Sequence, residues 1–236
     1  MATTKHPPQA AAKLSKAAVV DRALALADEL GLEALTIRRL AQELGVTPMA
    51  LYWHFRSKEE LLAALGDRVW AQIDIDIDPA ADWPAQLRGE LESLVAVLRA
   101  HRSASQLLLA GEKMHSEASI SATETALAVL RRGGFSPEQA SEIARSAMWT
   151  ALTLVMSEPG YNPAGTTEER TEVLRQNRIR LAMLPPDRFP CVVEAAGPLT
   201  ACDDPDFHYQ FGIDVFIAGV VAVAASPRTP PASAGS

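Results

Sequence analysis

Residues 45–55 collect side chains that suit contact with a nucleic acid, and they read GVTPMALYWHF. Threonine and tyrosine hydroxyls can bind phosphates and base edges, imidazole can bind phosphates, and apolar groups can contact thymine methyls. Thr47 followed by Pro48 indicates the start of a short helix, because a proline in the first turn costs no helical hydrogen bond. What this helix can do depends on which of its faces is exposed.

Helical spacing divides the stretch into two faces. One face is apolar and can pack on neighbouring helices; it consists of Val46, Ala50 and Leu51. The opposite face carries the side chains that could contact DNA: Thr47, Pro48, Met49, Tyr52, Trp53 and His54. The alternative is that the aromatic rings only pack this helix on the next one, which we expect for Phe55 and in part for Trp53.

Helix start signals place the stretch in a larger helical unit. Apolar spacing predicts a helix over about residues 15–30 and a second over 36–44, capped by Thr36. Ser57 opens a fourth helix, with Glu60 as its capping-box partner. The second helix, a glycine-containing turn and the short third helix form a helix-turn-helix pattern, in which the third helix enters the DNA major groove.

The charge distribution limits where DNA could bind. The net charge is −7 over 236 residues, which argues against phosphate contacts over the whole chain. Residues 1–60 hold eight Lys and Arg against seven Asp and Glu, so the acidic excess lies in the remainder. Binding to phosphates would have to come from the N-terminal quarter.

The rest of the chain is also helical in pattern, with no convincing strand. The helices expected there span about residues 82–100, 116–132, 136–156, 168–184 and 205–224. Residues 185–205 are too rich in Pro, Gly and Asp to be regular. We predict an all-α fold with four segments: disordered residues 1–13, a three-helix helix-turn-helix domain at 14–60, a C-terminal helical domain at 61–225, and a disordered tail at 226–236.

Residues 35–65 read LTIRRLAQELGVTPMALYWHFRSKEELLAAL, which resembles the N-terminal domain of TetR/AcrR-family transcriptional regulators. Three further stretches resemble the C-terminal domain of the tetracycline-repressor branch: WPAQLRGELESLVAVLRAHR, RRGGFSPEQA and FHYQFGIDVFIAGV. The resemblance implies a homodimer, most simply a repressor, that reads a palindromic operator and is released when its C-terminal domain binds a small effector.

The resemblance also implies DNA-contacting positions. Arg38 matches a position that can reach a base, for which the alternative is a solvated surface arginine, and Lys58 matches a phosphate contact beside a helix N-terminus. The predicted DNA-binding residues are Thr36, Arg38, Thr47, Pro48, Met49, Tyr52, Trp53, His54 and Lys58.

The effector is not identified by the resemblance. Tetracycline-binding members carry a His, an Asn, a second His and a Gln in the pocket, where ungapped matching finds Asp74, Glu90, Leu108 and Ala126. Tetracycline with magnesium is therefore not supported. Candidates for a different pocket are His101, Gln106, Met114, His115 and Trp149, with ordinary packing or exposure as the alternative for each.

Two helices carry faces that could join two subunits in a four-helix contact. The predicted interface residues are Ile143, Ala147, Ala151, Phe211, Val215, Ala218 and Ala222. The alternative is that these side chains are buried within one chain. A rigid interface matters, because paired helix-turn-helix domains must reach half-sites about 34–36 Å apart.

Neither catalysis nor a metal or cofactor is predicted. Cys191 and Cys202 lack the CxxC spacing, and no HExxH, GxSxG, P-loop or dinucleotide motif is present. The apolar run at 216–225 is about half the length needed to cross a bilayer, and no secretory signal opens the sequence, so we expect a cytoplasmic protein without a membrane partner. The rival function is a small-molecule-binding or catalytic helical protein with an idle helix-turn-helix.

Overall fold

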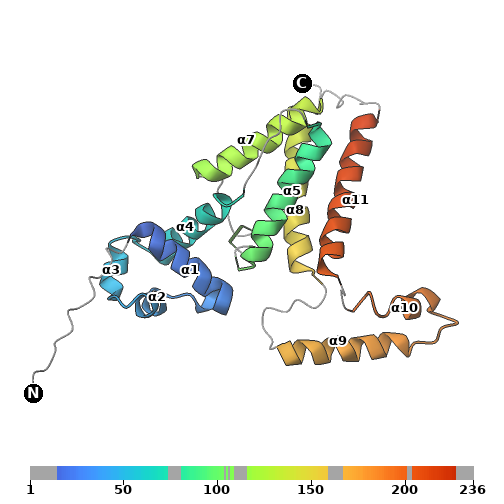
Figure 1. Cartoon of the computed structure of the whole chain (residues 1–236), viewed down its shortest axis with the longest axis horizontal. Helices are drawn as coiled ribbons and strands as arrows, with labels where there is room; N and C mark the ends of the chain where they lie inside the picture. Colours follow the sequence, from blue (N-terminus) through green and yellow to red (C-terminus); the bar gives the residue numbers. More distant parts are fainter. Residues whose placement is uncertain are drawn as a thin grey trace, which may run out of the picture. The chain divides into compact units, whose positions relative to one another are not determined.

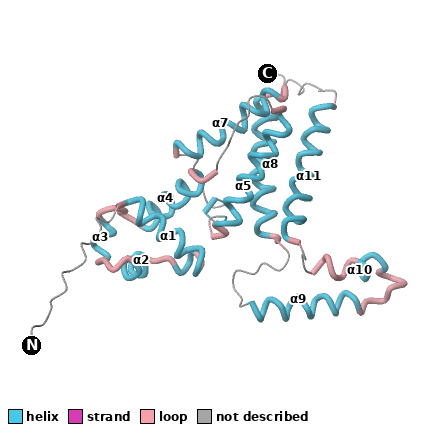
Figure 2. Tube along the Cα trace, viewed as in Figure 1, coloured by secondary structure: helices cyan, strands magenta, loops and turns pink. Residues whose placement is uncertain are grey.

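The structure is a computed structural model that describes residues 15–73, 81–103, 105, 107–108, 116–158, 167–200 and 204–226. These residues form helices joined by turns, with no strand among them, so the all-α prediction is confirmed (Figure 2). Residues 1–13 and 227–236, predicted to be disordered, lie outside the described residues.

The chain divides into two compact units after Arg68 rather than after residue 60. The difference arises because α4 is one continuous helix, and its residues Leu61 and Leu65 are fully buried. Most of α4 therefore belongs to the N-terminal unit.

The described residues of the first unit form four α-helices, the last of which continues to Trp70, and one short 3₁₀ helix (Figure 1). They are α1 (Lys16–Leu30), η1 (Leu32–Ala34), α2 (Ile37–Glu43), α3 (Pro48–Tyr52) and α4 (Lys58–Trp70). Thr36 caps α2 and Thr47 caps α3, each accepting a backbone N–H three residues on. Gly45 in the turn between them has φ +65°, a left-handed conformation that glycine adopts without strain. The predicted helix-turn-helix is formed.

A small core and surface ion pairs hold α3 in place. Leu35, Leu40, Leu51 and Phe55 are each at most 1% exposed. On the surface, the Arg22 guanidinium of α1 lies 2.8 Å from the Glu43 carboxylate at the end of α2. Exposed ion pairs contribute about 0–1 kcal/mol each, so the buried side chains supply most of the stabilisation.

Among the described residues of the second unit, four longer helices form a bundle (Figure 1). They are α5 (Trp83–Ala100), α7 (Glu117–Arg132), α8 (Pro137–Met156) and α11 (Pro205–Ala225). α5 and α8 pack on each other, and each also packs on α7 and α11. Leu87, Leu91, Leu98, Leu152 and Ile213 are buried where these helices meet.

Two further helices in the second unit are α9 (Thr167–Ala182) and α10 (Pro190–Glu194), which contact each other. The prediction of irregular structure throughout residues 185–205 was wrong. Pro190 starts α10, because its fixed φ and missing N–H suit the first helical turn. The helix is short, and turns follow it over residues 195–200.

Among the described residues, α11 is long and apolar enough, by length and composition, to cross a membrane. Its residues Tyr209, Ile213, Ile217 and Val220 recur at three and four along one face and are buried in the bundle core. Only 22% of the apolar 18-residue window of α11 is buried, so α11 buries one face, whereas the sequence led us to expect a core helix.

Candidate functional site

The two faces of α3 differ in exposure as the sequence pattern predicts. Leu51 and Phe55 are 0% exposed, whereas Met49 is 68%, Tyr52 is 50% and Trp53 is 86% exposed. The expectation that Trp53 packs in part on the next helix was wrong, because little of its ring is covered. Three large side chains on one short helix thus face solvent, an arrangement typical of an interaction surface.

The capping threonines keep donor capacity toward solvent. Each hydroxyl oxygen accepts a backbone hydrogen bond, at 3.1 Å from Arg39 N to Thr36 and 3.3 Å from Ala50 N to Thr47. Since a hydroxyl is donor and acceptor at once, both hydrogens remain available to an acceptor such as phosphate. Arg38 is exposed on α2 and forms no ion pair with any residue that the structure describes.

Backbone N–H groups at the start of α4 already donate hydrogen bonds to side chains of the chain itself. Ser57 Oγ accepts from Glu60 N at 3.2 Å, as the predicted capping box requires. The Glu60 carboxylate, however, accepts from Arg56 N at 2.8 Å rather than from Ser57 N, so the reciprocal bond is shifted by one residue. His54 and Lys58, the predicted phosphate contacts, are half-buried here.

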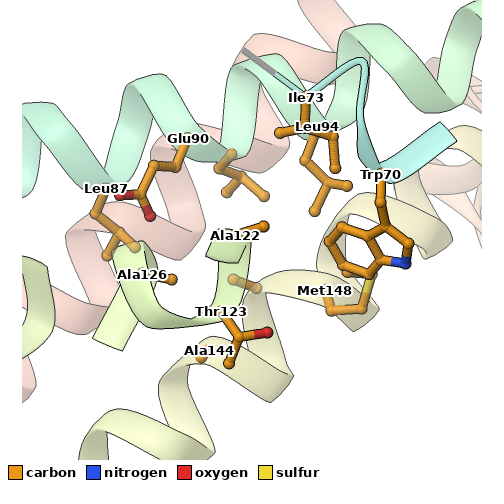
Figure 3. Close-up of a pocket in the computed structure, with 12 residues that line it drawn as sticks. Trp70, Ile73, Leu87, Glu90, Leu94, Ala122, Thr123, Ala126, Ala144 and Met148 are labelled. Carbon is orange, nitrogen blue, oxygen red and sulfur yellow. The ribbon is translucent and has the colours of Figure 1, made fainter. Parts of the chain in front are cut away.

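A pocket opens in the second unit among the helices of the bundle (Figure 3). Its lining is mostly apolar: Trp70, Ile73, Leu87, Glu90, Leu91, Leu94, Ala122, Thr123, Ala126, Ala144, Ala147 and Met148. The space between these side chains is about 580 Å³ including the solvent at its mouth. Small-molecule sites in proteins are commonly apolar concavities with a few polar groups, and the lining of this pocket has that composition.

Glu90 is the only charged residue in the described lining of the pocket. Its Oε1 is buried and has no hydrogen-bond partner among the residues that the structure describes. Burial raises the pKa of the Glu90 carboxyl to about 7, and the positive charge of Arg132 offsets only part of that effect. Figure 3 shows the carboxylate reaching from α5 toward Leu87 and Ala126, while Trp70 and Met148 line the other end.

Of the residues predicted to bind an effector, His101 and Trp149 are described, and neither lines the pocket. His101 ends α5, and its Nε2 lies 3.0 Å from Gln72 Oε1. Trp149 is 54% exposed on the outer side of α8. Gln106, Met114 and His115 lie outside the described residues.

Among the described residues, two positions matched to the tetracycline-binding residues of the family line the pocket, whereas the residues selected by type do not. Glu90 and Ala126, two of the four matched positions, both line it. Leu108 packs against the bundle core, and Asp74 lies outside the described residues. A local signal for Glu90 was also present, because it lies three residues after Leu87 and four before Leu94, on the apolar stripe of its helix.

The predicted subunit interface is only half exposed. Phe211, Val215, Ala218 and Ala222 form an exposed strip along α11. The residues assigned to α8 lie elsewhere: Ala151 is fully buried, Ile143 is half-buried against the bundle core, and Ala147 lines the pocket.

That part of the prediction needs correction, because helical periodicity alone did not distinguish which apolar face of α8 the chain covers itself. The apolar side chains that α8 exposes are Trp149 and Met156, which are seven residues apart and therefore share a face.

The described lining of the pocket holds few oxygen ligands for a metal. It offers one carboxylate and the Thr123 hydroxyl, whereas magnesium in octahedral geometry needs further oxygens from water or from the bound molecule. Among the described residues, no three His, Cys, Asp or Glu side chains are grouped to hold a metal.

Comparison with known proteins identifies both units. The family model described as "Bacterial regulatory proteins, tetR family" matches residues 19–65, and "Tetracyclin repressor-like, C-terminal domain" matches residues 77–224. Tetracycline repressor protein class A from transposon 1721 of Escherichia coli is 32% identical over 218 residues, covering 88% of this chain and 91% of that relative.

Solved structures agree with this family assignment. ActR of Streptomyces coelicolor in complex with actinorhodin is 27% identical, with a TM-score of 0.77, and the match covers 91% of this chain and 99% of that one. A TetR variant from Acinetobacter baumannii AYE in complex with minocycline is 26% identical, with a TM-score of 0.63, covering 91% and 100%. The chain belongs to the tetR family of bacterial regulatory proteins and is a ligand-responsive DNA-binding transcriptional regulator.

Proposed function

We propose that the chain is a homodimeric repressor whose two copies of α3 bind the half-sites of a palindromic operator, and that a small effector in the second unit releases it. The observation that carries the proposal is the division of α3, with Leu51 buried and Met49, Tyr52 and Trp53 open to solvent. A regulator of this kind acts where the operator is, so we place it in the cytoplasm.

The exposed side chains fit two kinds of DNA contact. Arg38, Thr47, Pro48, Met49 and Tyr52 would face base edges in the major groove, since arginine suits guanine and apolar groups suit the thymine methyl. Thr36, Trp53, His54 and Lys58 would lie toward the sugar-phosphate backbone. Ser57 and Glu60 already satisfy groups at the start of α4, so phosphate binding there would rest on the Lys58 ammonium.

The exposed apolar strip supports the dimer. Phe211 and Val215 on α11 and Trp149 on α8 are each more than half exposed in the single chain. Exposed large apolar side chains favour burial against a partner, and a second copy offers the same side chains by two-fold symmetry. The proposed interface keeps the four α11 residues and replaces the three α8 residues with Trp149 and Met156.

Helix α4 supplies a route from effector to DNA. It begins at Lys58 in the first unit, and its last residue, Trp70, lines the pocket in the second. An effector that binds better when α4 is displaced would lower operator affinity by its preference for that state, typically about 1–3 kcal/mol.

A binding assay on defined DNA tests the proposal. An operator selected from random-sequence DNA is titrated with wild type, Arg38→Ala, Tyr52→Ala and Arg180→Ala at one salt concentration. Arg180 is exposed on α9, so its loss changes the net charge as much as the loss of Arg38 while leaving the first unit intact. We expect operator affinity to fall about tenfold or more for Arg38→Ala and Tyr52→Ala and to be unchanged for Arg180→Ala.

Two outcomes would contradict the proposal. If Arg38→Ala and Tyr52→Ala bind as tightly as wild type, the exposed face of α3 and its neighbour α2 are not the reading surface. If selection yields no preferred sequence and binding only follows salt concentration, the helix-turn-helix is idle and the rival function stands.

A further inference from the structure

Glu90 is an acidic residue in a pocket wall that is otherwise mostly apolar. It lies on α5 between Leu87 and Leu94, and both of these neighbours are buried parts of the pocket wall. An acidic side chain in that position lowers the apolar area of the core and must be dehydrated, so it works against stability unless something pairs with it.

The described residues do not supply that partner. Glu90 Oε1 is buried without a hydrogen bond. Arg132 is the cation that acts on it, but the Arg132 guanidinium is hydrogen-bonded to Gln86 Oε1, and Gln86 in turn donates to Ala81 O at 3.0 Å. These polar groups therefore bond to one another, and Glu90 Oε1 is left without a hydrogen-bond partner among the described residues.

The pocket lets a ligand reach the carboxylate. Its mouth is open, and the remainder of its wall, including Trp70 and Met148, offers apolar and aromatic surface. A ligand with an apolar body and a protonated nitrogen would bury the body against this wall. It would also give the carboxylate a charge-assisted hydrogen bond, which is about twice as strong as a neutral one.

We propose that the effector is a lipophilic organic cation, in which a protonated amine pairs with Glu90 while an apolar or aromatic body fills the pocket. The inference rests on the proposed role of this pocket as the effector site. Glu90 then acts as a specificity residue. Its carboxylate repels an anionic ligand, and its hydrogen bond to a neutral ligand is weaker than its hydrogen bond to an ammonium.

The test uses three naphthalene probes that share one ring system and differ in charge. They are 2-naphthylmethylamine, 2-naphthalenemethanol and 2-naphthoate, each titrated calorimetrically into the full-length protein at about pH 7.5, above the pKa of Glu90, without DNA. We expect the amine to bind at least about tenfold more tightly than the alcohol and the acid to bind most weakly.

Two glutamine variants locate the effect. Glu90→Gln keeps the side-chain shape and removes the charge, and we expect it to lower amine affinity about tenfold while changing alcohol affinity less than about threefold. Glu92→Gln is the matched control, because Glu92 lies on the same helix, does not line this pocket, and pairs on the surface with Arg88 at 3.6 Å. Amine affinity is expected to be unchanged in that variant.

The proposal is overturned if the acid binds wild type as well as the amine, if the amine does not bind at millimolar concentration, or if Glu90→Gln leaves amine affinity unchanged. The comparison of probes on wild type needs no variant to fold. The titration contains no DNA, so it tests the ligand proposal separately from operator binding. A negative titration would not argue against operator binding, and a negative operator assay would not change how the titration is read.

Discussion

The exposed face of α3 and the pocket in the second unit are built in opposite ways. The α3 face comes from neighbouring residues, Thr47 to His54, on one five-residue helix and the residues that flank it. The pocket takes side chains from α5, α7 and α8 and from the end of α4, at positions as far apart as Trp70 and Met148. A site made of local sequence can be recognised from its pattern, whereas a site made by packing can be recognised only when the packing is known.

The largest expected effect is on the free energy of unfolding, and it distinguishes the buried face of α3 from its exposed face. Leu51→Ala removes a fully buried side chain and is expected to lower the free energy of unfolding by about 2–5 kcal/mol. Met49→Ala changes a side chain that is 68% exposed, and its effect on unfolding should stay within about 0.5 kcal/mol. Guanidinium unfolding followed by circular dichroism measures both. Equal losses of stability would mean that the two faces of α3 are not distinct.

A smaller effect probes the pocket through pH. The pKa of the Glu90 carboxyl is about 7 in the folded chain against 4.5 ordinarily, so the folded state holds the proton more tightly. The stability that this group contributes is full below pH 4.5 and is lost as the pH rises through about 7.

Glu90→Gln removes the ionisable group, so the variant does not lose stability at this position as the pH rises. Because the side chain is partly open to solvent, we expect the variant to be more stable than wild type by roughly 1–2 kcal/mol at about pH 8, with the difference shrinking toward about pH 5. Thermal unfolding at the two pH values measures this. A difference that does not depend on pH would show that Glu90 is already ionised and solvated.

The smallest effect concerns the turn that aims α3. Gly45 has φ +65° and Gly66 does not have a positive φ, and an added Cβ would meet nothing within 4 Å at either position. Gly45→Ala should therefore cost about 1 kcal/mol through backbone strain alone. Gly66→Ala, inside α4, should stabilise by about 0.5–1 kcal/mol. Thermal unfolding of the two variants compares them, and a gain from both would contradict the left-handed turn.

The sequence predicted most of the helices because their signals are local. Thr36 and Thr47 cap the helices whose starts they were expected to mark, and Asp82 and Ser136 cap the helices expected from about residues 82 and 136. The side-chain oxygen of each accepts a hydrogen bond from a backbone N–H. Helix α10 was missed because a five-residue helix has too few positions to show a period, and its start at Pro190 looks like a loop signal.

The pocket and the outer face of α8 were harder to predict for a different reason. Ala147 and Ala151 have the same spacing as an interface stripe, and Trp149 could equally have been a pocket residue. Which side of α8 is covered depends on α5, α7 and α11, so no property of α8 alone decides it. Residue type misled for the same reason: His101 was selected because histidine binds ligands, yet it ends a helix and meets Gln72.

The central claim is that two copies of α3, held at a fixed separation, bind two half-sites. It is tested most directly by measuring affinity for the selected operator before and after about five base pairs, half a helical turn, are inserted between its half-sites, which turns one half-site to the opposite side of the duplex. The account predicts a loss of about 100-fold or more, because a rigid dimer reaches only half-sites that lie on one side at about 34–36 Å. Unchanged affinity after the insertion would contradict it.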